Sequence, residues 1–287
     1  MSNKRGRLFV VATPIGNLDD ISARALRVLA DVASVAAEDT RHSGRLLAHF
    51  NIDTPLVSLH DHNERAKTDM LIERLGQGQD IALVSDAGTP VVSDPGYYLV
   101  RQVRAAGFDV IPIPGACAAI VALSASGLAS DRFAFEGFPP ARAGARREYF
   151  AGLAREPRTL IFYESPHRIL DSLADMVANF GATREVVVAR EITKRFEDIR
   201  SGHLGELLTH YRAHAAQCAG EFVVLIAGQP ADALRDIDVD AERVLDILAA
   251  ELPVKQAASL AARITGLKKN VLYQRLVAAK GAAPNNE

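Results

Sequence analysis

The sequence predicts an α/β protein in which two strand–helix alternations are followed by a group of short helices. Short apolar runs alternate with longer amphipathic ones through the first 125 residues, and a second alternation begins after Gly127. Three helical segments finish the chain. Alternation of this kind requires a mostly parallel sheet covered by helices. At 287 residues the chain is long enough for two domains.

In the first half, apolar runs too short for helices mark the strands, and the segments between them have helical spacing. Gly76 and Gly107 close the third and fourth helices, as glycine commonly does at helix ends. We expect strands at residues 7–12, 32–38, 55–59, 80–85 and 108–114, and helices at 18–29, 40–50, 64–75, 94–106 and 116–127.

The second half repeats this pattern before the chain changes character. A polar stretch through Arg200 has no strand pattern, and residues 229–238 have the composition of a linker. We expect strands at 132–138, 158–165, 185–191 and 221–228, and helices at 142–154, 167–180, 204–214, 241–252, 255–265 and 268–279. The domain boundaries that follow are 1–125, 126–230, a linker at 231–240, and a helical tail at 241–287.

Composition excludes several classes of protein. The net charge is −2, no apolar run has membrane-spanning length, and the N-terminal segment lacks a secretory pattern. Cys117 and Cys218 lie far apart without metal-ligand spacing, so we expect a reduced, cytoplasmic protein without disulfides or membrane contact. His60 and His62 form an H-x-H pair without a third ligand, and we expect no metal.

Glycine- and proline-rich turns follow three strands of the first half, where α/β folds bind ligands. "VVATPIGNLDD" contains neither a dinucleotide fingerprint nor a lysine-bearing phosphate loop. "LVSDAGTPVVSDPG" is dense enough in Gly and Pro to hold the backbone in one particular shape, with Asp94 and Pro95 starting the next helix. "PIPGACAAI" offers small residues and a helix start, where a ligand can approach the backbone closely.

Charged residues gather at the ends of other strands. Glu38, Asp39 and Arg41 follow the second strand, Glu164 follows "LIFY", and Glu191 with Lys194 follows "VVAR". Asp39 is also a candidate helix cap, and Arg41 a candidate ion-pair partner of Glu38. Clustered at sheet ends, these side chains are candidates for substrate handling.

The C-terminal helices carry a charge asymmetry. Six basic residues and no acidic one lie between Pro253 and Lys280. With a turn at Gly266, the segment is typical of a helix-turn-helix in which Lys268, Lys269, Asn270 and Gln274 enter the nucleic acid. A small bundle packed on the body is the alternative; we favour contact with an RNA backbone.

Taken in order, the motifs of both halves resemble the tetrapyrrole methylase superfamily, and within it a branch that acts on ribosomal RNA. The resemblance spans about residues 7 to 280 and rests on Thr13-Pro14-Ile15-Gly16-Asn17-Leu18, Glu38-Asp39-Thr40-Arg41, Ser85-Asp86-Ala87-Gly88-Thr89-Pro90 with Ser93-Asp94-Pro95-Gly96, Pro114-Gly115, Phe162-Tyr163-Glu164-Ser165, and Ala189-Arg190-Glu191. It implies two α/β/α domains with S-adenosyl-L-methionine in the cleft between them. It also implies 2′-O-methylation of a cytidine ribose in the 16S rRNA of the small ribosomal subunit, and a homodimer.

The resemblance also implies roles for individual residues. Gly88-Thr89-Pro90 stands where the superfamily often has Gly-Asp-Pro, and Cys117-Ala118 where a Ser/Thr-Ala pair is common. The implied cofactor contacts are Pro14, Gly88, Thr89, Pro90, Val92, Cys117, Ala118, Glu164, Gly220 and Glu221.

For the reaction itself, our hypothesis is that six charged residues hold the nucleotide, with one carboxylate or Lys194 assisting removal of the proton. These are Glu38, Asp39, Arg41, Asp86, Glu191 and Lys194. The candidate RNA-binding residues are Arg142, Arg146, Arg147, Lys268, Lys269 and Arg275.

Two rival interpretations remain open at this stage. One keeps a methyltransferase but changes the acceptor to a tetrapyrrole ring; the basic tail and the Glu38-Asp39-Thr40-Arg41 signature speak against it. The other is a DNA-binding regulator whose α/β body senses a small ligand. Both halves carry more loops with polar, charged and glycine-rich motifs than a ligand sensor requires, which speaks against this interpretation.

Overall fold

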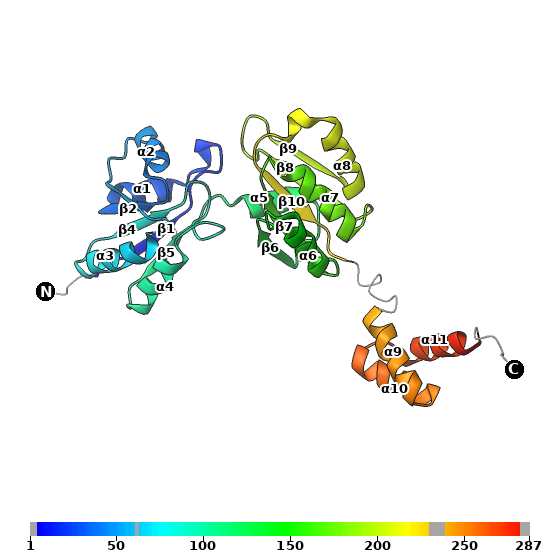
Figure 1. Cartoon of the computed structure of the whole chain (residues 1–287). Coiled ribbons are helices and arrows are strands. Elements are labelled where there is room, and N and C mark those ends of the chain that lie inside the picture. Colours follow the sequence, from blue (N-terminus) through cyan, green and yellow to red (C-terminus); the bar gives the residue numbers. More distant parts are fainter. Residues whose placement is uncertain (1–4, 61–62, 230–238, 282–287) are drawn as a thin grey trace. The chain divides into compact units, whose positions relative to one another are not determined.

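The computed structural model describes residues 5–60, 63–229 and 239–281 (Figure 1). The chain forms two compact units. One comprises the residues up to Ala154 together with Arg158–Ala227, and the other comprises Arg155–Pro157 and the chain from Gly228 onward. The linker expected at 231–240 lies almost entirely outside the described residues.

The first sheet of the larger unit is parallel throughout. Its strand order is β3-β2-β4-β1-β5, with strands β1 (Leu8–Val11), β2 (Ser34–Ala37), β3 (Leu56–Ser58), β4 (Ile81–Val84) and β5 (Val110–Ile113). The central strands are buried on both faces, which explains why their sequences read as continuous apolar runs. One apolar cluster contains residues of α1 (Ala23–Asp31) and α2 (Thr40–His49), and another contains residues of α3 (Glu64–Gly76) and α4 (Tyr97–Ala105).

Two helices of this half begin later than expected. Leu18–Asp20 forms a short 3₁₀ turn, and α1 begins after Ser22, whose Oγ accepts the Ala25 N–H at 3.1 Å. Helix α4 begins at Tyr97 rather than at Asp94, after Gly96 with φ 119°. Asp94 is therefore a loop residue and not a helix cap.

The second sheet is mixed. Its order is β6-β7-β10-β8-β9, with β6 (Phe133–Gly137), β7 (Thr159–Glu164), β8 (Glu185–Arg190), β9 (Asp198–His203) and β10 (Phe222–Ile226). Only β6 and β7 pair in parallel; the other three pairings are antiparallel. The polar stretch through Arg200 runs into edge strand β9, whose half-exposed residues lack the apolar signal of a central strand.

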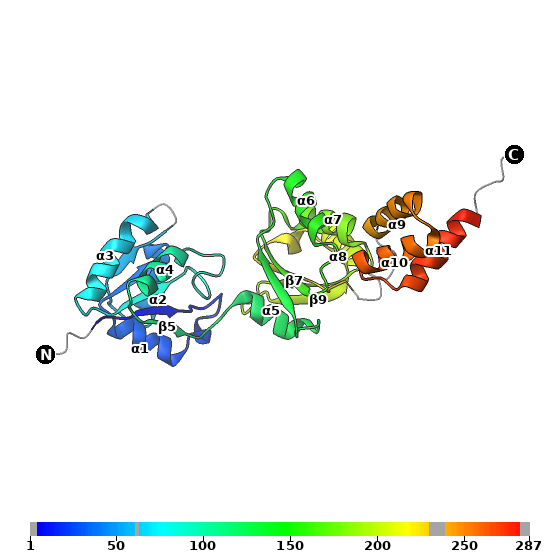
Figure 2. The same ribbon diagram turned by 90° about the horizontal axis from the view of Figure 1, so that it is seen from below.

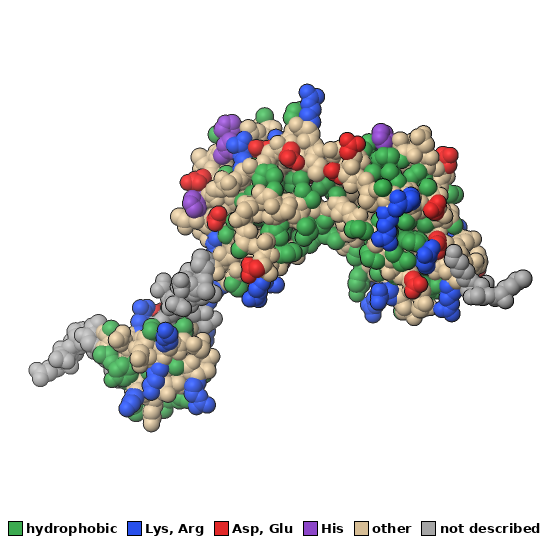
Figure 3. Space-filling view, turned by 180° about the vertical axis from the view of Figure 1, so that it is seen from behind, with side chains coloured by type: hydrophobic (Ala, Val, Ile, Leu, Met, Phe, Trp, Pro, Cys, Tyr) green, Lys and Arg blue, Asp and Glu red, His purple; other side chains and the backbone are tan. Residues whose placement is uncertain are grey.

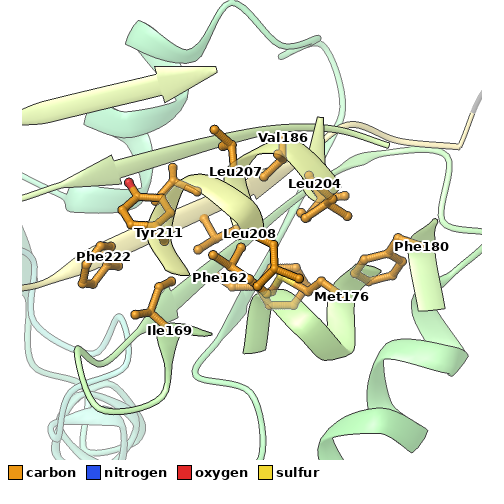
Figure 4. Packing of buried hydrophobic residues seen from close by; sticks show 14 of the residues in the cluster. Phe162, Ile169, Met176, Phe180, Val186, Leu204, Leu207, Leu208, Tyr211 and Phe222 are labelled. Carbon is orange, nitrogen blue, oxygen red and sulfur yellow. The ribbon is translucent and has the colours of Figure 1, made fainter. Parts of the chain in front are cut away.

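Helices cover both faces of this sheet. The helices α6 (Ala143–Leu153), α7 (Ile169–Phe180) and α8 (Leu204–Ala213) pack on one face around Phe162, Met176 and Tyr211 (Figure 4). Helix α5 (Ala118–Ser126) packs on the opposite face against β7 and β10 (Figures 1 and 2). Ile15, from the loop after β1, joins the same cluster as α5. The larger unit thus has apolar packing that runs from the first half into the second.

The smaller unit has its own small core. Helices α9 (Val239–Glu251), α10 (Val254–Thr265) and α11 (Lys269–Gly281) pack through Leu245, Leu272 and Leu276 against three buried alanines of α10. Gly266 ends α10 with φ 73°, as expected for the turn of a helix-turn-helix. None of the described helices has the length and apolar character needed to cross a membrane.

A buried ion pair fixes α6 on α7. Arg146 is only 3% exposed, and its Nε lies 2.8 Å from Asp175 Oδ2. We expect Arg146→Ala to lower the free energy of unfolding by about 3 kcal/mol, because it leaves the Asp175 carboxylate without its partner. The neighbouring exposed residue provides the control: Arg147→Ala should change stability by less than about 0.5 kcal/mol. Urea unfolding of both variants measures the difference; equal stabilities would show that the ion pair does not stabilise the packing.

Candidate functional site

The loops after β1 and β4 are joined by a short backbone bridge. The Thr13 N–H donates to Gly88 O at 2.8 Å, and the Gly88 N–H donates to Thr13 O at 3.1 Å. The buried Thr13 hydroxyl also donates to Ser85 O at 3.3 Å. Because both loops leave the carboxyl edge of the parallel sheet, the bridge converts two flexible connections into one shelf.

The loop after β4 has an unusual backbone. Gly88, Val91, Ser93 and Gly96 all have positive φ, at 87°, 75°, 64° and 119°. Non-glycine residues rarely adopt this region, and such strain is concentrated at functional sites. The Thr89 hydroxyl donates to Ala116 O at 2.9 Å, which ties the loop after β5 to the same shelf.

A cavity of about 370 Å³ opens above this shelf. Its walls come from the loops after β1, β4, β6, β7 and β8, from the start of α5, and from β7 and β10. The lining residues are Ile15, Asp86, Ala87, Gly88, Thr89, Val92, Ser93, Asp94, Cys117, Ala118, Phe138, Tyr163, Glu164, Ser165, Pro166, Ile192, Glu221, Phe222 and Val223. The volume lies within the range of small-molecule sites.

All the charged side chains that line the cavity are acidic: Asp86, Asp94, Glu164 and Glu221. Two of them have cationic partners. Glu164 is fully buried, with Arg168 Nη2 2.9 Å from Oε1 and the Ser172 hydroxyl donating to Oε2. Glu221 Oε2 lies 2.8 Å from Lys194 Nζ. Neither Asp86 nor Asp94 has an ion pair with any described residue.

The two remaining aspartates differ in their surroundings. Asp86 Oδ1 accepts the Asp39 N–H at 3.1 Å. Burial raises the pKa of Asp94 to about 6, the charge of Asp86 adds to the shift, and the Ser85 hydroxyl opposes it. A cavity-lining carboxyl whose pKa lies close to physiological pH is typical of a functional site.

Aromatic side chains form one wall of the cavity. The Tyr163 hydroxyl accepts the Ala119 N–H at 3.2 Å, which anchors the start of α5 to β7. The ring meets Phe135 and Phe138 edge-on, with centroids 4.9 and 5.6 Å away. Burial raises the pKa of the Tyr163 phenol, so it is neutral at physiological pH. Such a wall suits a flat, weakly polar ring.

A charged cluster stands at the edge of the cavity. Lys194 Nζ lies 2.9 Å from Glu191 Oε1 and 2.8 Å from Glu221 Oε2. Burial alone would lower the pKa of Lys194, but its hydrogen bonds to the two glutamates and their charges raise it above its ordinary value. The lysine stem crosses Gly16, where an added Cβ would lie 2.3 Å from Lys194 Cγ. Glycine at position 16 therefore lets the lysine lie against the loop after β1.

The structure brings some of the expected cofactor contacts together and leaves others outside. Of these contacts, the cavity is lined by Gly88, Thr89, Val92, Cys117, Ala118, Glu164 and Glu221; Asp86, expected to hold the nucleotide, lines it too. Pro14 and Pro90 are buried and do not line it. Gly220 lies beside it, and its lack of a side chain makes room for Glu191, because an added Cβ would lie 2.5 Å from that side chain.

The charged residues after β2 lie outside the cavity. Asp39 caps α2 by accepting the Arg41 N–H at 2.8 Å, and its pKa is lowered by hydrogen bonds from Arg41. The Arg41 guanidinium, 86% exposed, pairs with Asp39 rather than with Glu38. Glu38 is half-buried after the last residue of β2.

Two of the expected RNA-binding arginines are engaged within the protein. Arg146 is buried against Asp175, so its guanidinium does not reach the surface. This corrects the expectation that Arg146 lies on an RNA-binding surface. Arg275 pairs with Glu242. Arg142, Arg147, Lys268 and Lys269 are exposed. Figure 3 shows Lys and Arg side chains over the C-terminal helices (lower left).

Sequence reasoning missed several lining residues. It assigned Asp94 to a helix start, although the repeated Ser-Asp pairs at 85–86 and 93–94 signal similar loop chemistry. Tyr163 stood inside a quoted motif without a role. Phe138 and Ile192 carry no local signal, because only the tertiary fold brings them to the cavity.

Comparisons with known proteins agree with this architecture. A family model for tetrapyrrole (corrin/porphyrin) methylases matches residues 7–208, and one for the RsmI C-terminal HTH domain matches residues 235–280. A uroporphyrin-III-C-methyltransferase structure from Thermus thermophilus superposes with a TM-score of 0.54 at 21% identity, covering 78% of this chain and 94% of that chain. At that identity the likeness concerns the fold alone.

Curated relatives are much more similar. The ribosomal RNA small subunit methyltransferase I of Pseudomonas aeruginosa is 59% identical, over 96% of this chain and 98% of that protein. The protein of the same name from Escherichia coli O157:H7 is 54% identical, over 97% of each chain. The chain therefore belongs to the tetrapyrrole methylase family and, within it, to the ribosomal RNA small subunit methyltransferase I family.

Proposed function

We propose that this protein uses S-adenosyl-L-methionine to methylate the 2′-hydroxyl of a cytidine ribose in the 16S rRNA of the small ribosomal subunit. The observation that carries the cofactor assignment is the charge of the cavity. Asp86 and Asp94 face it without ion-pair partners, and among the described residues that line it there is no Lys or Arg. A carboxylate partly removed from water is stabilised by a nearby positive charge. The ligand that satisfies this cavity is a cation.

The cofactor fits this requirement. S-adenosyl-L-methionine carries a sulfonium, an ammonium and a carboxylate, so it is a cation overall, on a body with a flat adenine ring and no phosphate. The shelf of Gly88 and Thr89 lets a ligand approach the backbone closely, and Tyr163 with Ile192 and Val223 offers apolar walls. An anionic dinucleotide would meet the carboxylates of Asp86 and Asp94, with no Lys or Arg among the described lining residues.

The bound cofactor supplies an activated methyl group. The protein's residues then have to hold the donor, orient the 2′-oxygen in line with it, exclude water and accept a proton. We propose that the shelf of Gly88, Thr89 and Val92, with Cys117 and Ala118, holds the donor, and that Pro14 and Pro90 brace the shelf from beneath. Glu38, Asp39 and Arg41, which lie outside the cavity, stay the candidates for holding the nucleotide, whereas Asp86 lines the cavity and faces the donor.

Lys194 and its two glutamates have a different role in this proposal. A lysine held by two carboxylates, with its pKa raised, is a poor proton acceptor. Its stem lies against Gly16 while its ammonium neutralises Glu221 at the edge of the cavity. We propose that Lys194 positions the loop after β1 over the site, and that Glu191 and Gly220 support it.

The basic helices suit the acceptor. Lys268 and Lys269 are exposed at the start of α11, and Arg142 and Arg147 are exposed at α6. Phosphates are bound by such residues without reading of bases. We propose that they hold the ribosomal RNA, that the protein works as a homodimer, and that it acts in the cytoplasm, where ribosomes are.

The function is tested by incubating the protein with methyl-labelled S-adenosyl-L-methionine and 30S subunits, free 16S rRNA or a tetrapyrrole. We expect label on a cytidine ribose of the RNA. Label in the ring compound would favour a tetrapyrrole methyltransferase. Ligand-dependent binding of duplex DNA without any transfer would favour the regulator.

The role of Lys194 is tested by Lys194→Met. We expect the KM for the cofactor to rise about tenfold, because Glu221 loses its neutralising partner and the loop after β1 loses its support. The pH dependence of kcat should keep its shape. Arg195→Ala, at an exposed neighbour, is the control and should behave like the wild type. A changed pH profile in Lys194→Met would instead identify the lysine as the proton acceptor.

The role of the C-terminal helices is tested by reversing Lys268 and Lys269 to Glu together. We expect RNA affinity to fall by about tenfold or more at ~0.1 M salt, since fewer counterions are released. Cofactor affinity should not change. Arg101→Glu with Arg104→Glu, on exposed positions of α4, gives the same net charge. If both double variants lose RNA binding equally, net charge rather than α11 is responsible.

A further inference from the structure

Neither helix capping nor an ion pair with a described residue explains why Asp94 lies at the cavity. Helix α4 begins at Tyr97 with Gly96 at its cap position, so the Asp94 carboxylate does not cap it. No described residue forms an ion pair with Asp94. The left-handed backbone at Ser93 and Gly96 brackets Asp94 where it lines the cavity. Strained backbone around a half-buried, unpaired carboxylate costs stability, and such costs are retained where function requires them.

The groups that surround Asp94 leave its charge uncompensated. Asp86, from the same loop, is a like charge; the Ser85 hydroxyl is a single neutral donor. Across the cavity, the Tyr163 phenol is neutral and Cys117 lies beside it.

The remaining acidic groups of the cavity already have partners of their own. Glu164 is held by Arg168, and Glu221 is held by Lys194. The Arg168 and Lys194 cations are therefore committed to those glutamates, and a positive charge next to Asp94 comes with the ligand.

We propose that Asp94 is the residue by which the cavity distinguishes the methyl donor from its demethylated product. Its carboxylate attracts the sulfonium charge, which the donor has and the thioether product lacks. The inference rests on the proposed function and assigns it a determinant of cofactor specificity. Asp86, which also binds the Asp39 N–H, is left to the charge that donor and product share, the ammonium.

A proton balance follows from this assignment. Near pH 6 the Asp94 carboxyl is about half protonated in the free protein, because its pKa is about 6. The sulfonium charge lowers that pKa, so binding of the donor releases the proton to solvent. When the sulfonium charge is lost, Asp94 takes a proton back from solvent. The product therefore binds without this electrostatic contribution and dissociates more readily.

The test is calorimetric titration of the full chain with S-adenosyl-L-methionine and with S-adenosylhomocysteine, in buffers of different ionisation enthalpy. At pH 6 we expect the wild type to release about half a proton per donor bound, and at pH 8 almost none. The product should release little at either pH. Asp94→Asn should bind the donor at least about tenfold more weakly, bind the product within about threefold of wild type, and release no proton.

Two controls separate this effect from misfolding. Asp31→Asn makes the same change at an exposed position at the end of α1 and should titrate like the wild type. Asp94→Asn removes a charge that is costly in the free protein, so its melting temperature at pH 8 should equal or exceed that of the wild type.

Distinct outcomes overturn the inference. If Asp94→Asn weakens donor and product equally, the carboxylate faces the ammonium group that both carry. If the wild type and Asp94→Asn release equal amounts of proton on binding the donor, Asp94 does not sense the sulfonium. A wild type that binds neither compound contradicts the proposed function itself, and the inference with it.

Discussion

The pair of hydrogen bonds between Thr13 and Gly88 is the constraint on which the site depends. It joins the loops after β1 and β4 at the carboxyl edge of the parallel sheet. Thr89 then ties in the loop after β5, and Ile15 carries the shelf into the apolar cluster under α5. Without this bridge, three loops would move independently, and no backbone surface would be held ready for a ligand.

The distribution of charge divides the work between two regions. The cavity is acidic, and its outer glutamates are neutralised by Lys194 and Arg168 while Asp86 and Asp94 are not. Helices α10 and α11 are basic. An acidic cavity repels phosphates and favours a cationic methyl donor, whereas exposed lysines attract the RNA backbone. Under the proposed function, each region suits one of the two substrates and disfavours the other.

The strained backbone of the loop after β4 and the unpaired Asp94 destabilise the fold, and packing elsewhere in the molecule offsets this loss of stability. Val91 and Ser93 adopt left-handed conformations inside a loop held by Thr13, Ser85 and Thr89. The cores on either side of the second sheet, and the buried pair of Arg146 with Asp175, supply the surrounding rigidity. A site with this much strain requires a scaffold that cannot relax around it.

Local sequence determined the elements and most of the shelf. Apolar runs, helical spacing and glycine-rich turns predicted the strands of the first sheet and placed Gly88, Thr89 and Cys117 at a ligand site, because strands, helices and turns are set by neighbouring residues. Tertiary structure decided the antiparallel pairings of the second sheet, edge strand β9, and the packing of α5 on that sheet. It also moved Asp94 from a helix start into the cavity and Arg146 from the surface into an ion pair with Asp175. Those outcomes depend on which distant residues meet, and a pattern along the chain carries no record of distance in space.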